Sequence, residues 1–166
     1  ALAASMDHIG PMTRTVEDAA IMFEAMAGPD PHDPSSLPDP VPSVRAELGR
    51  GIAGLRVGFD RRYANDNVDP DVARAMDDVL AELTRMGATV VTVKMPDVSK
   101  VGNAWLDLCA VEALAANAKT FPSRASEYGP GLRAALESGQ RVTPAALAVA
   151  AKVRSEVSAS LERMLN

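Results

Sequence analysis

The fold of this chain is decided by residues 55–95, LRVGFDRRYANDNVDPDVARAMDDVLAELTRMGATVVTVKM. Leu55–Phe59 and Thr89–Lys94 are short runs rich in apolar and β-branched residues, which predicts two strands. Between them, Asp69-Pro70 supplies a helix cap followed by proline at the first helical position, and an apolar stripe then recurs at helical spacing. A strand, a helix and a strand with short connections predict a βαβ unit with parallel strands and a right-handed crossover.

The regions on either side predict further helices. Residues 1–28 predict a strand, a turn and a helix that Thr15 caps, and residues 29–54 predict a Pro-rich surface loop, because proline removes backbone donors. Residues 103–166 predict a helical part, with helices at 103–119 and 130–138 and a long last helix from Thr143-Pro144 onward. We therefore interpret residues 1–166 as a single fragment of one α/β domain. The start at Ala1, in the middle of an expected strand, favours a piece of a longer protein.

Composition and charge argue against several classes of protein. The net charge is −5 and the longest basic cluster is Arg61-Arg62, so a nucleic-acid-binding face is not expected. No apolar run approaches the roughly 20 residues that a membrane span requires. Cys109 is the single cysteine, which leaves no internal disulfide and no thiolate zinc site, and its apolar neighbours predict a buried, inert thiol. We expect a cytoplasmic protein without a cofactor or a metal.

Two histidines raise the question of a hydrolase triad. Ser5, Asp7 and His8 contain the right residue types, but neighbours on one extended segment point to opposite faces and cannot converge. His32 lies in the proline-rich loop, where a general base would be poorly held. Neither histidine is therefore predicted to be catalytic.

Two further motifs match a pattern without its structural context. GRGIAG at residues 49–54 fits G-x-G-x-x-G, yet it precedes a strand, whereas the dinucleotide motif follows a strand and opens a helix. The acidic segment at residues 60–71 lacks the central glycine and closing glutamate of a calcium loop, so a polar loop ending in a helix cap explains it better. Considered alone, the residues predict an α/β piece without an active site.

The stretch from Ser5 to Ala20 is SMDHIGPMTRTVEDAA. It resembles the motif S-x-D-x-x-G-P-x-x-R-x-V-x-D-A-A of amidase-signature enzymes, which follows their nucleophile region. AGPDPHDPSSLPDPVP, then GLRVGF, VDP and GATVVTVKMP, and finally AVEALAANAKTFPSRASEYGPGLRAALESG resemble later parts of the family in the same order. The resemblance spans essentially all 166 residues.

This resemblance implies a mixed β-sheet flanked by helices and a serine acyl-enzyme mechanism that cleaves amide bonds. The implied Ser–Ser–Lys residues lie upstream of Ser5, so no catalytic residue is assigned to this chain and the isolated piece is expected to be inactive. The implied partner is a small-molecule amide, and a homodimer stays open. The resemblance implies that the helices at residues 105–119 and 130–138 lie near the substrate funnel of the family. Four residues of the first helix are therefore substrate-pocket candidates: Trp105, Leu108, Glu112 and Asn117.

The first motif also has a structural interpretation. Gly10-Pro11 is expected to form a tight turn, and Asp7 and Arg14 are spaced so that they could pair across it, pinning the turn against the sheet of the family. A role for Asp7 or Arg14 in contacting substrate is the less favoured alternative.

Two other functions remain open at this stage. The chain could be a stand-alone, non-catalytic binding or interaction domain, in which case its sheet edge must be sealed. It could also belong to an amidotransferase subunit that acts on glutamine. The second alternative ranks below an amidase, because the segment Arg133-Ala134-Ala135 is poorer in basic residues than the corresponding helix usually is.

Overall fold

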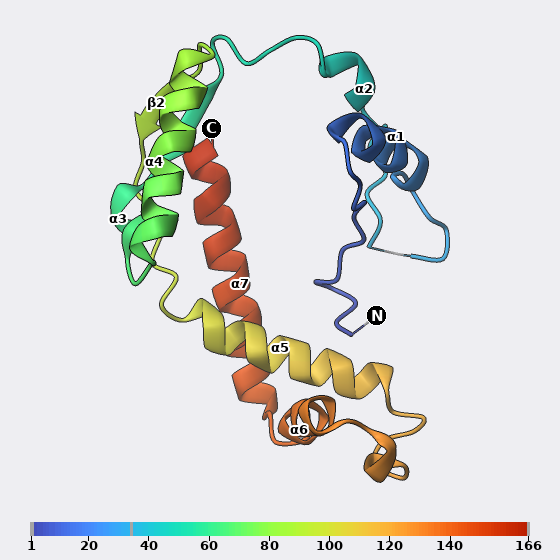
Figure 1. Ribbon diagram of the computed structural model, residues 1–166. Coiled ribbons are helices and arrows are strands. Elements are labelled where there is room, and N and C mark those ends of the chain that lie inside the picture. The colour runs from blue at the N-terminus through green and yellow to red at the C-terminus, as the bar shows by residue number, and fades with distance from the viewer. Residues whose placement is uncertain (1, 34, 166) are drawn as a thin grey trace. The chain divides into compact units, whose positions relative to one another are not determined.

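The computed structural model describes residues 2–33 and 35–165. Its contacts divide the chain into two compact units, of which one joins the N-terminal stretch up to His8 to the residues from Met95 onward. The other unit is Ile9–Lys94. Figure 1 labels the elements of both units. The interpretation of the whole chain as a fragment of one domain stays a prediction.

The βαβ unit is confirmed. Strands β1 (Arg56–Phe59) and β2 (Thr89–Thr92) pair in parallel, with Val57 opposite Val90. Helix α4 (Pro70–Arg85) connects them and packs beside β2 (Figure 1). Among the described residues these are the only two paired strands, so the unit is one parallel pair with its crossover helix.

Helix α4 begins where Asp69-Pro70 predicts, and a glycine follows its end. The Asp69 carboxylate accepts a hydrogen bond from the backbone N–H of Asp71 at 2.8 Å, which caps the first turn. After the helix, Gly87 has a φ of +94°, and a Cβ at this position would lie 3.1 Å from the Cα of Ala53. A glycine is therefore required here both for the left-handed conformation and for the close approach of residue 53.

Two segments expected to be loops contain short helices. Helix α2 (Val44–Glu47) lies within residues 29–54, and the backbone N–H of Arg45 donates to the Glu24 carboxylate of α1 at 2.9 Å. Helix α3 (Arg61–Asn65) lies in the acidic segment, where the Asp60 carboxylate accepts from the backbone N–H of Tyr63 at 3.1 Å. Side-chain caps explain both the helix and the acidic composition of that segment.

The N-terminal region differs from its prediction. Helix α1 (Val16–Met26) is capped by Thr15 as expected, since the Thr15 Oγ1 accepts from the backbone N–H of Asp18 at 3.0 Å. The expected strand before it is wrong, because the backbone N–H groups of Met6 and Asp7 donate to the Ala3 carbonyl at 2.9 and 2.8 Å. The Asp7 carboxylate also accepts the N–H of Ala3 at 3.0 Å. These local hydrogen bonds form a turn and replace those of a strand ladder.

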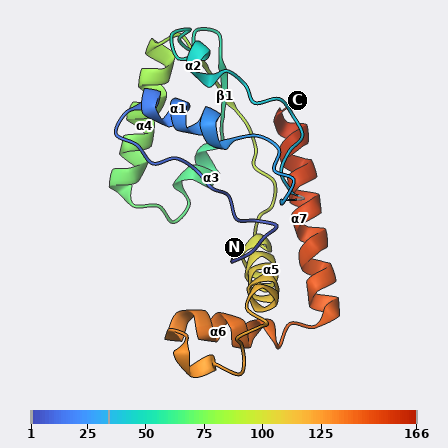
Figure 2. The ribbon, with the colours of Figure 1, turned by 90° about the vertical axis from the view of Figure 1, so that its right-hand side faces the viewer.

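The helical unit is organised around α5 (Val101–Ala116). Its first half packs with α7 (Pro144–Leu165) in a buried cluster formed by Ala104, Leu108 and Ala150. Its second half packs with α6 (Pro130–Gly139) in another cluster formed by Ala113, Phe121 and Leu136. The 3₁₀ helix η1 (Ala125–Glu127) precedes α6. Figure 2 views α5 almost along its axis, with α6 and α7 on different sides of it.

None of the helices within residues 2–33 and 35–165 is long and apolar enough to cross a membrane.

The contact between α5 and α6 depends on a glycine at the end of α6. Gly139 is the last residue of α6 and is buried. A Cβ on it would lie 2.4 Å from the carbonyl oxygen of Ala110 on α5, well inside van der Waals contact. Gly139 therefore allows the two backbones to approach closely.

We predict that Gly139→Ala lowers the free energy of unfolding by about 1–3 kcal/mol, because the added methyl overlaps backbone that cannot move cheaply. Gly131→Ala in the same helix is the control, since nothing lies within 4 Å of the added Cβ. It should be neutral or stabilising by up to about 1 kcal/mol. Urea unfolding of both variants measures the difference, and equal stabilities would contradict the close-packing interpretation.

Cys109 lies on α5 and is half-buried, not fully buried as expected from its neighbours. Burial is the main cause that raises the pKa of its thiol, and the negative charges of Glu112 and Asp7 raise it further. At a given pH the thiolate fraction is therefore smaller than in an unfolded chain.

The rate of Cys109 alkylation by iodoacetamide should rise with pH, and its midpoint should lie at higher pH in the folded chain than in the urea-unfolded chain. In the unfolded chain a cysteine has a pKa of about 8.5. The midpoint isolates the pKa from steric access, because access scales the rate at every pH equally. A folded midpoint at or below the unfolded one would show that the surroundings of the thiol do not disfavour its charged form.

Candidate functional site

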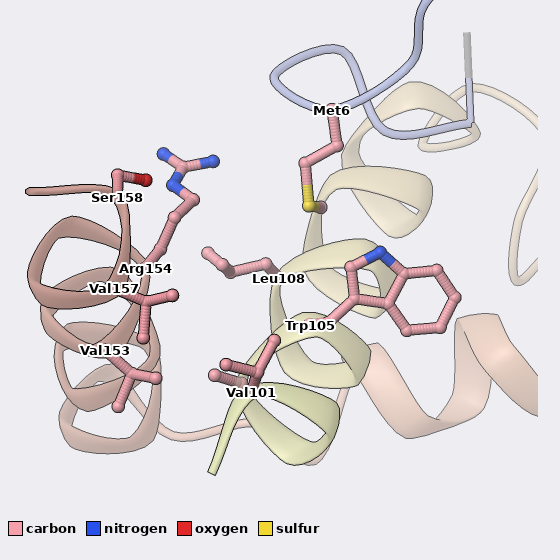
Figure 3. A pocket seen from close by; sticks show the side chains of 9 residues that line it. Met6, Val101, Trp105, Leu108, Val153, Arg154, Val157 and Ser158 are labelled. Atoms are coloured by element: carbon pink, nitrogen blue, oxygen red, sulfur yellow. The ribbon is translucent and has the colours of Figure 1, made fainter. Parts of the chain in front are cut away.

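A pocket of about 190 Å³ lies within the helical unit, between α5, α7 and the N-terminal turn (Figure 3). Most of its lining is apolar. Nine residues line it: Met6, Val101, Ala104, Trp105, Leu108, Val153, Arg154, Val157 and Ser158. Such a mostly apolar hollow with a few polar groups is the usual form of a small-molecule site.

Helical spacing brings these residues to one side of each helix. On α5 the lining positions are 101, 104, 105 and 108, and on α7 they are 153, 154, 157 and 158. Residues three and four apart share a helix face, so each helix presents two adjacent turns to the pocket. The N-terminal turn adds Met6, which packs against the cluster of Ala104, Leu108 and Ala150.

Arg154 is the one charged side chain in the lining of this pocket. Its Nη1 donates a hydrogen bond to the Ser5 hydroxyl oxygen at 2.8 Å. In Figure 3 the guanidinium extends from α7 toward the side of the pocket that Met6 occupies, and Leu108 lies between it and Trp105. The pocket therefore combines an apolar interior with one fixed positive charge.

Ser5 also connects to α5. The Glu112 carboxylate accepts the backbone N–H of Ser5 at 2.8 Å through Oε2, and it accepts the Ser5 hydroxyl through Oε1. Ser5 thus bridges Glu112 on α5 and Arg154 on α7. We call Arg154, Ser5 and Glu112 the Ser5 relay.

The four substrate-pocket candidates occupy three different places. Trp105 and Leu108 line the pocket, with Trp105 54% exposed and Leu108 buried. Glu112 does not line it but binds Ser5, which touches the pocket residue Arg154. Asn117 lies beyond the end of α5, where it accepts from the Tyr128 hydroxyl at 3.2 Å. Glu112 and Asn117 therefore have separate partners, as their spacing predicts.

The residues of the first motif do not form a catalytic group. Ser5 binds Glu112, Asp7 accepts backbone N–H groups of its own turn, and His8 Nδ1 lies 2.8 Å from the Met6 carbonyl oxygen. Their separate partners agree with the rejection of a triad. Gly10, Pro11 and Arg14 belong to the unit Ile9–Lys94, whereas Asp7 belongs to the helical unit, so the pairing of Asp7 with Arg14 stays a prediction.

Sequence reasoning missed the N-terminal and α7 walls of the pocket. Val153 and Val157 are four positions apart on the last helix, and the same spacing places their neighbours Arg154 and Ser158 on an adjoining face. No local signal connects Met6 to α5, because a turn was not predicted there. Among residues 2–33 and 35–165, no group of three or more His, Cys, Asp or Glu residues is placed to hold a metal ion.

Comparisons with known proteins identify the family of this chain. The Amidase family model matches residues 1–165. An amidase from Pseudomonas putida is 37% identical over 163 residues, covering 98% of this chain and 35% of the relative. The A subunit of glutamyl-tRNA(Gln) amidotransferase from Rhodospirillum rubrum is 50% identical over 96 residues, covering 58% of this chain and 19% of the relative.

A solved structure superposes on nearly the whole chain. It comes from a vestigial protein complex described as revealing the evolutionary origins of an s-triazine catabolic enzyme. The TM-score is 0.83 at 30% identity, over 99% of this chain and 35% of the other. This match confirms the α/β fold class and its amidase-signature type.

The chain spans about a third of the length of the Pseudomonas putida amidase and of the solved structure. The family model nevertheless covers all but the last residue of the sequence, and the amidase relative matches 98% of the chain. The chain belongs to the amidase family, within the amidase-signature group of enzymes.

Proposed function

We propose that this chain is part of an enzyme that hydrolyses carboxamides through a serine acyl-enzyme, and that it supplies one wall of the substrate site. The family match over residues 1–165 is the observation that carries the proposal, and the 37% identity to an amidase over 98% of the chain supports it. In this proposal residues 1–166 are a fragment of one domain, and the Ser–Ser–Lys residues lie outside them. The cytoplasmic location and the homodimer stay predictions.

The lysines of the chain support a nucleophile outside it. A lysine that activates a serine must be neutral, which requires a desolvated position. The sequence has four lysines, and the structure describes all of them as exposed: Lys94, Lys100, Lys119 and Lys152. Lys152 in addition lies 3.6 Å from the Glu156 carboxylate.

The 166-residue chain should therefore neither hydrolyse simple aryl or aliphatic amides nor react with a fluorophosphonate probe at any of its serines. Mass spectrometry of the treated chain measures the labelling, and release of ammonia or amine measures the turnover. Amide turnover that the probe abolishes, with the probe found on a serine within residues 1–166, would contradict the proposal.

The pocket indicates which amides the enzyme would accept. Its volume of about 190 Å³ exceeds the roughly 150 Å³ of an apolar cavity that holds one benzene ring, so it has room for a small ring or a branched aliphatic group. The Arg154 guanidinium matches a carboxylate, which it can bind through two parallel N–H donors. The proposed substrates are amides that carry an apolar group and a carboxylate.

Trp105 is the only tryptophan, so its fluorescence reports on the pocket. Phenylacetate should change this fluorescence at lower concentration than the neutral phenylacetamide does. Arg154→Gln should weaken phenylacetate binding about tenfold, the effect of losing a charged hydrogen bond, and should leave phenylacetamide binding unchanged. The control is Arg163→Gln, on an exposed turn of α7 away from the pocket lining.

Equal affinities of the Arg154 and Arg163 variants for phenylacetate would contradict a carboxylate site. The same titration addresses a second function, an amidotransferase subunit that acts on glutamine. That function is favoured by the 50% identity to an amidotransferase A subunit over 96 residues. Glutamine carries both a carboxylate and a carboxamide but no apolar group, so tighter binding of glutamine than of phenylacetate would favour the amidotransferase.

The remaining alternative is a stand-alone, non-catalytic binding module. Such a module must protect the outer edges of β1 and β2, because unpaired strand edges invite association. A monodisperse chain that unfolds cooperatively as a monomer would favour this module over a part of a larger enzyme.

A further inference from the structure

We propose that Glu112 is a positioning residue that acts through the Ser5 hydroxyl to hold the Arg154 guanidinium at the pocket. The inference rests on the proposed substrate site and adds the group that orients its positive charge. Neither Glu112 nor Ser5 lines the pocket, so both act on a ligand only through Arg154.

The direction of the Ser5 relay follows from the chemistry of its three members. An arginine side chain can only donate hydrogen bonds, and an ionised carboxylate can only accept them. A serine hydroxyl has one proton to donate and two lone pairs to accept with. Ser5 must therefore donate to Glu112 and accept from Arg154, and no other assignment satisfies both contacts.

Glu112 fixes the Ser5 hydroxyl at two points. One carboxylate oxygen accepts the backbone N–H of Ser5 at 2.8 Å, and the other accepts its hydroxyl proton. The backbone contact positions the residue, and the hydroxyl contact turns the lone pairs of Oγ toward the Arg154 Nη1 at 2.8 Å. A hydroxyl without this carboxylate could rotate and present its proton to the guanidinium, which would repel it.

The need for such a relay follows from the exposure of Arg154. Its side chain is exposed, and the structure gives it no carboxylate partner within the described residues. A free arginine samples many rotamers, and ordering it on binding costs affinity. A contact to a hydroxyl holds the guanidinium without neutralising it, so its charge stays available to an anion. A direct ion pair with Glu112 would instead compete with the ligand.

The relay also places Met6. Residue 6 follows Ser5 directly, and the Met6 side chain packs on the cluster that contains Leu108. The turn is held from its other side by the Asp7 carboxylate, which accepts the Ala3 N–H. Anchoring Ser5 to α5 therefore sets both the charged and the N-terminal apolar wall of the pocket.

The experiment titrates the full chain and each variant with phenylacetate and with phenylacetamide and follows the Trp105 fluorescence. The ratio of the two affinities gives the preference of each variant for phenylacetate. Ser5→Ala and Glu112→Gln should each reduce this preference about three- to fivefold. Ser5→Ala removes the hydroxyl, and Glu112→Gln places an amide N–H group against either the backbone N–H or the hydroxyl of Ser5, which both donate. Ser5→Thr keeps the hydroxyl and should keep the preference. Glu137→Gln, at an exposed position of α6, is the control for removing a negative charge.

The double variant Ser5→Ala, Glu112→Gln should lose no more preference than either single variant, because both changes interrupt one relay. A merely structural role would weaken both ligands equally and leave their ratio unchanged, and that result would overturn the proposal. Additive losses in the double variant would overturn it as well.

A measurement without ligand separates the relay from the proposed substrate site. In nuclear magnetic resonance spectra, a guanidinium held at Nη1 should show slowed rotation of its Nη groups in the parent chain and in Ser5→Thr. The rotation should become fast in Ser5→Ala and Glu112→Gln. If the rotation changes in this way while Arg154→Gln does not alter phenylacetate binding, the substrate site is wrong and the relay stands. If the rotation is the same in all variants, the relay is wrong.

Discussion

The close packing of α5 between α6 and α7 is the constraint on which the helical unit depends. Gly139 brings the α6 backbone against Ala110, and Leu136 is completely buried beside Ala113. On the other side, Leu108 packs against Ala150 of α7. Small residues on α5 allow these approaches, since alanine and glycine leave room for a neighbouring backbone. The two contacts together fix how α5 presents its remaining surface.

That remaining surface carries two of the substrate-pocket candidates. Ala104 and Leu108 of α5 pack against α7 and Ala113 packs against α6, whereas Trp105 is exposed and Glu112 is half-buried. Trp105 then forms the apolar wall of the pocket, and Glu112 reaches the N-terminal turn. Trp105 and Glu112 are seven positions apart, so about two helical turns of α5 separate the pocket lining from the contact with Ser5.

Local signals were sufficient to predict most of the elements. The caps at Asp69 and Thr15 each act within a few residues, so the starts of α4 and α1 follow from the sequence. The first turn could not be predicted in this way. The apolar run from Ala1 to Met6 favours a strand, but the Asp7 carboxylate accepts nearby backbone N–H groups and closes a turn instead.

The candidate site was predictable only in part, for a related reason. Trp105 and Leu108 lie three positions apart on one helix face, and periodicity alone brings them together. The Ser5 relay joins residues that are 107 and 149 positions apart, so no local spacing can indicate it. The polarity of such a contact is nevertheless set by residue type once the fold has made it. A serine between an arginine and a glutamate has one way to satisfy both neighbours, and this gives an exposed hydroxyl a defined direction.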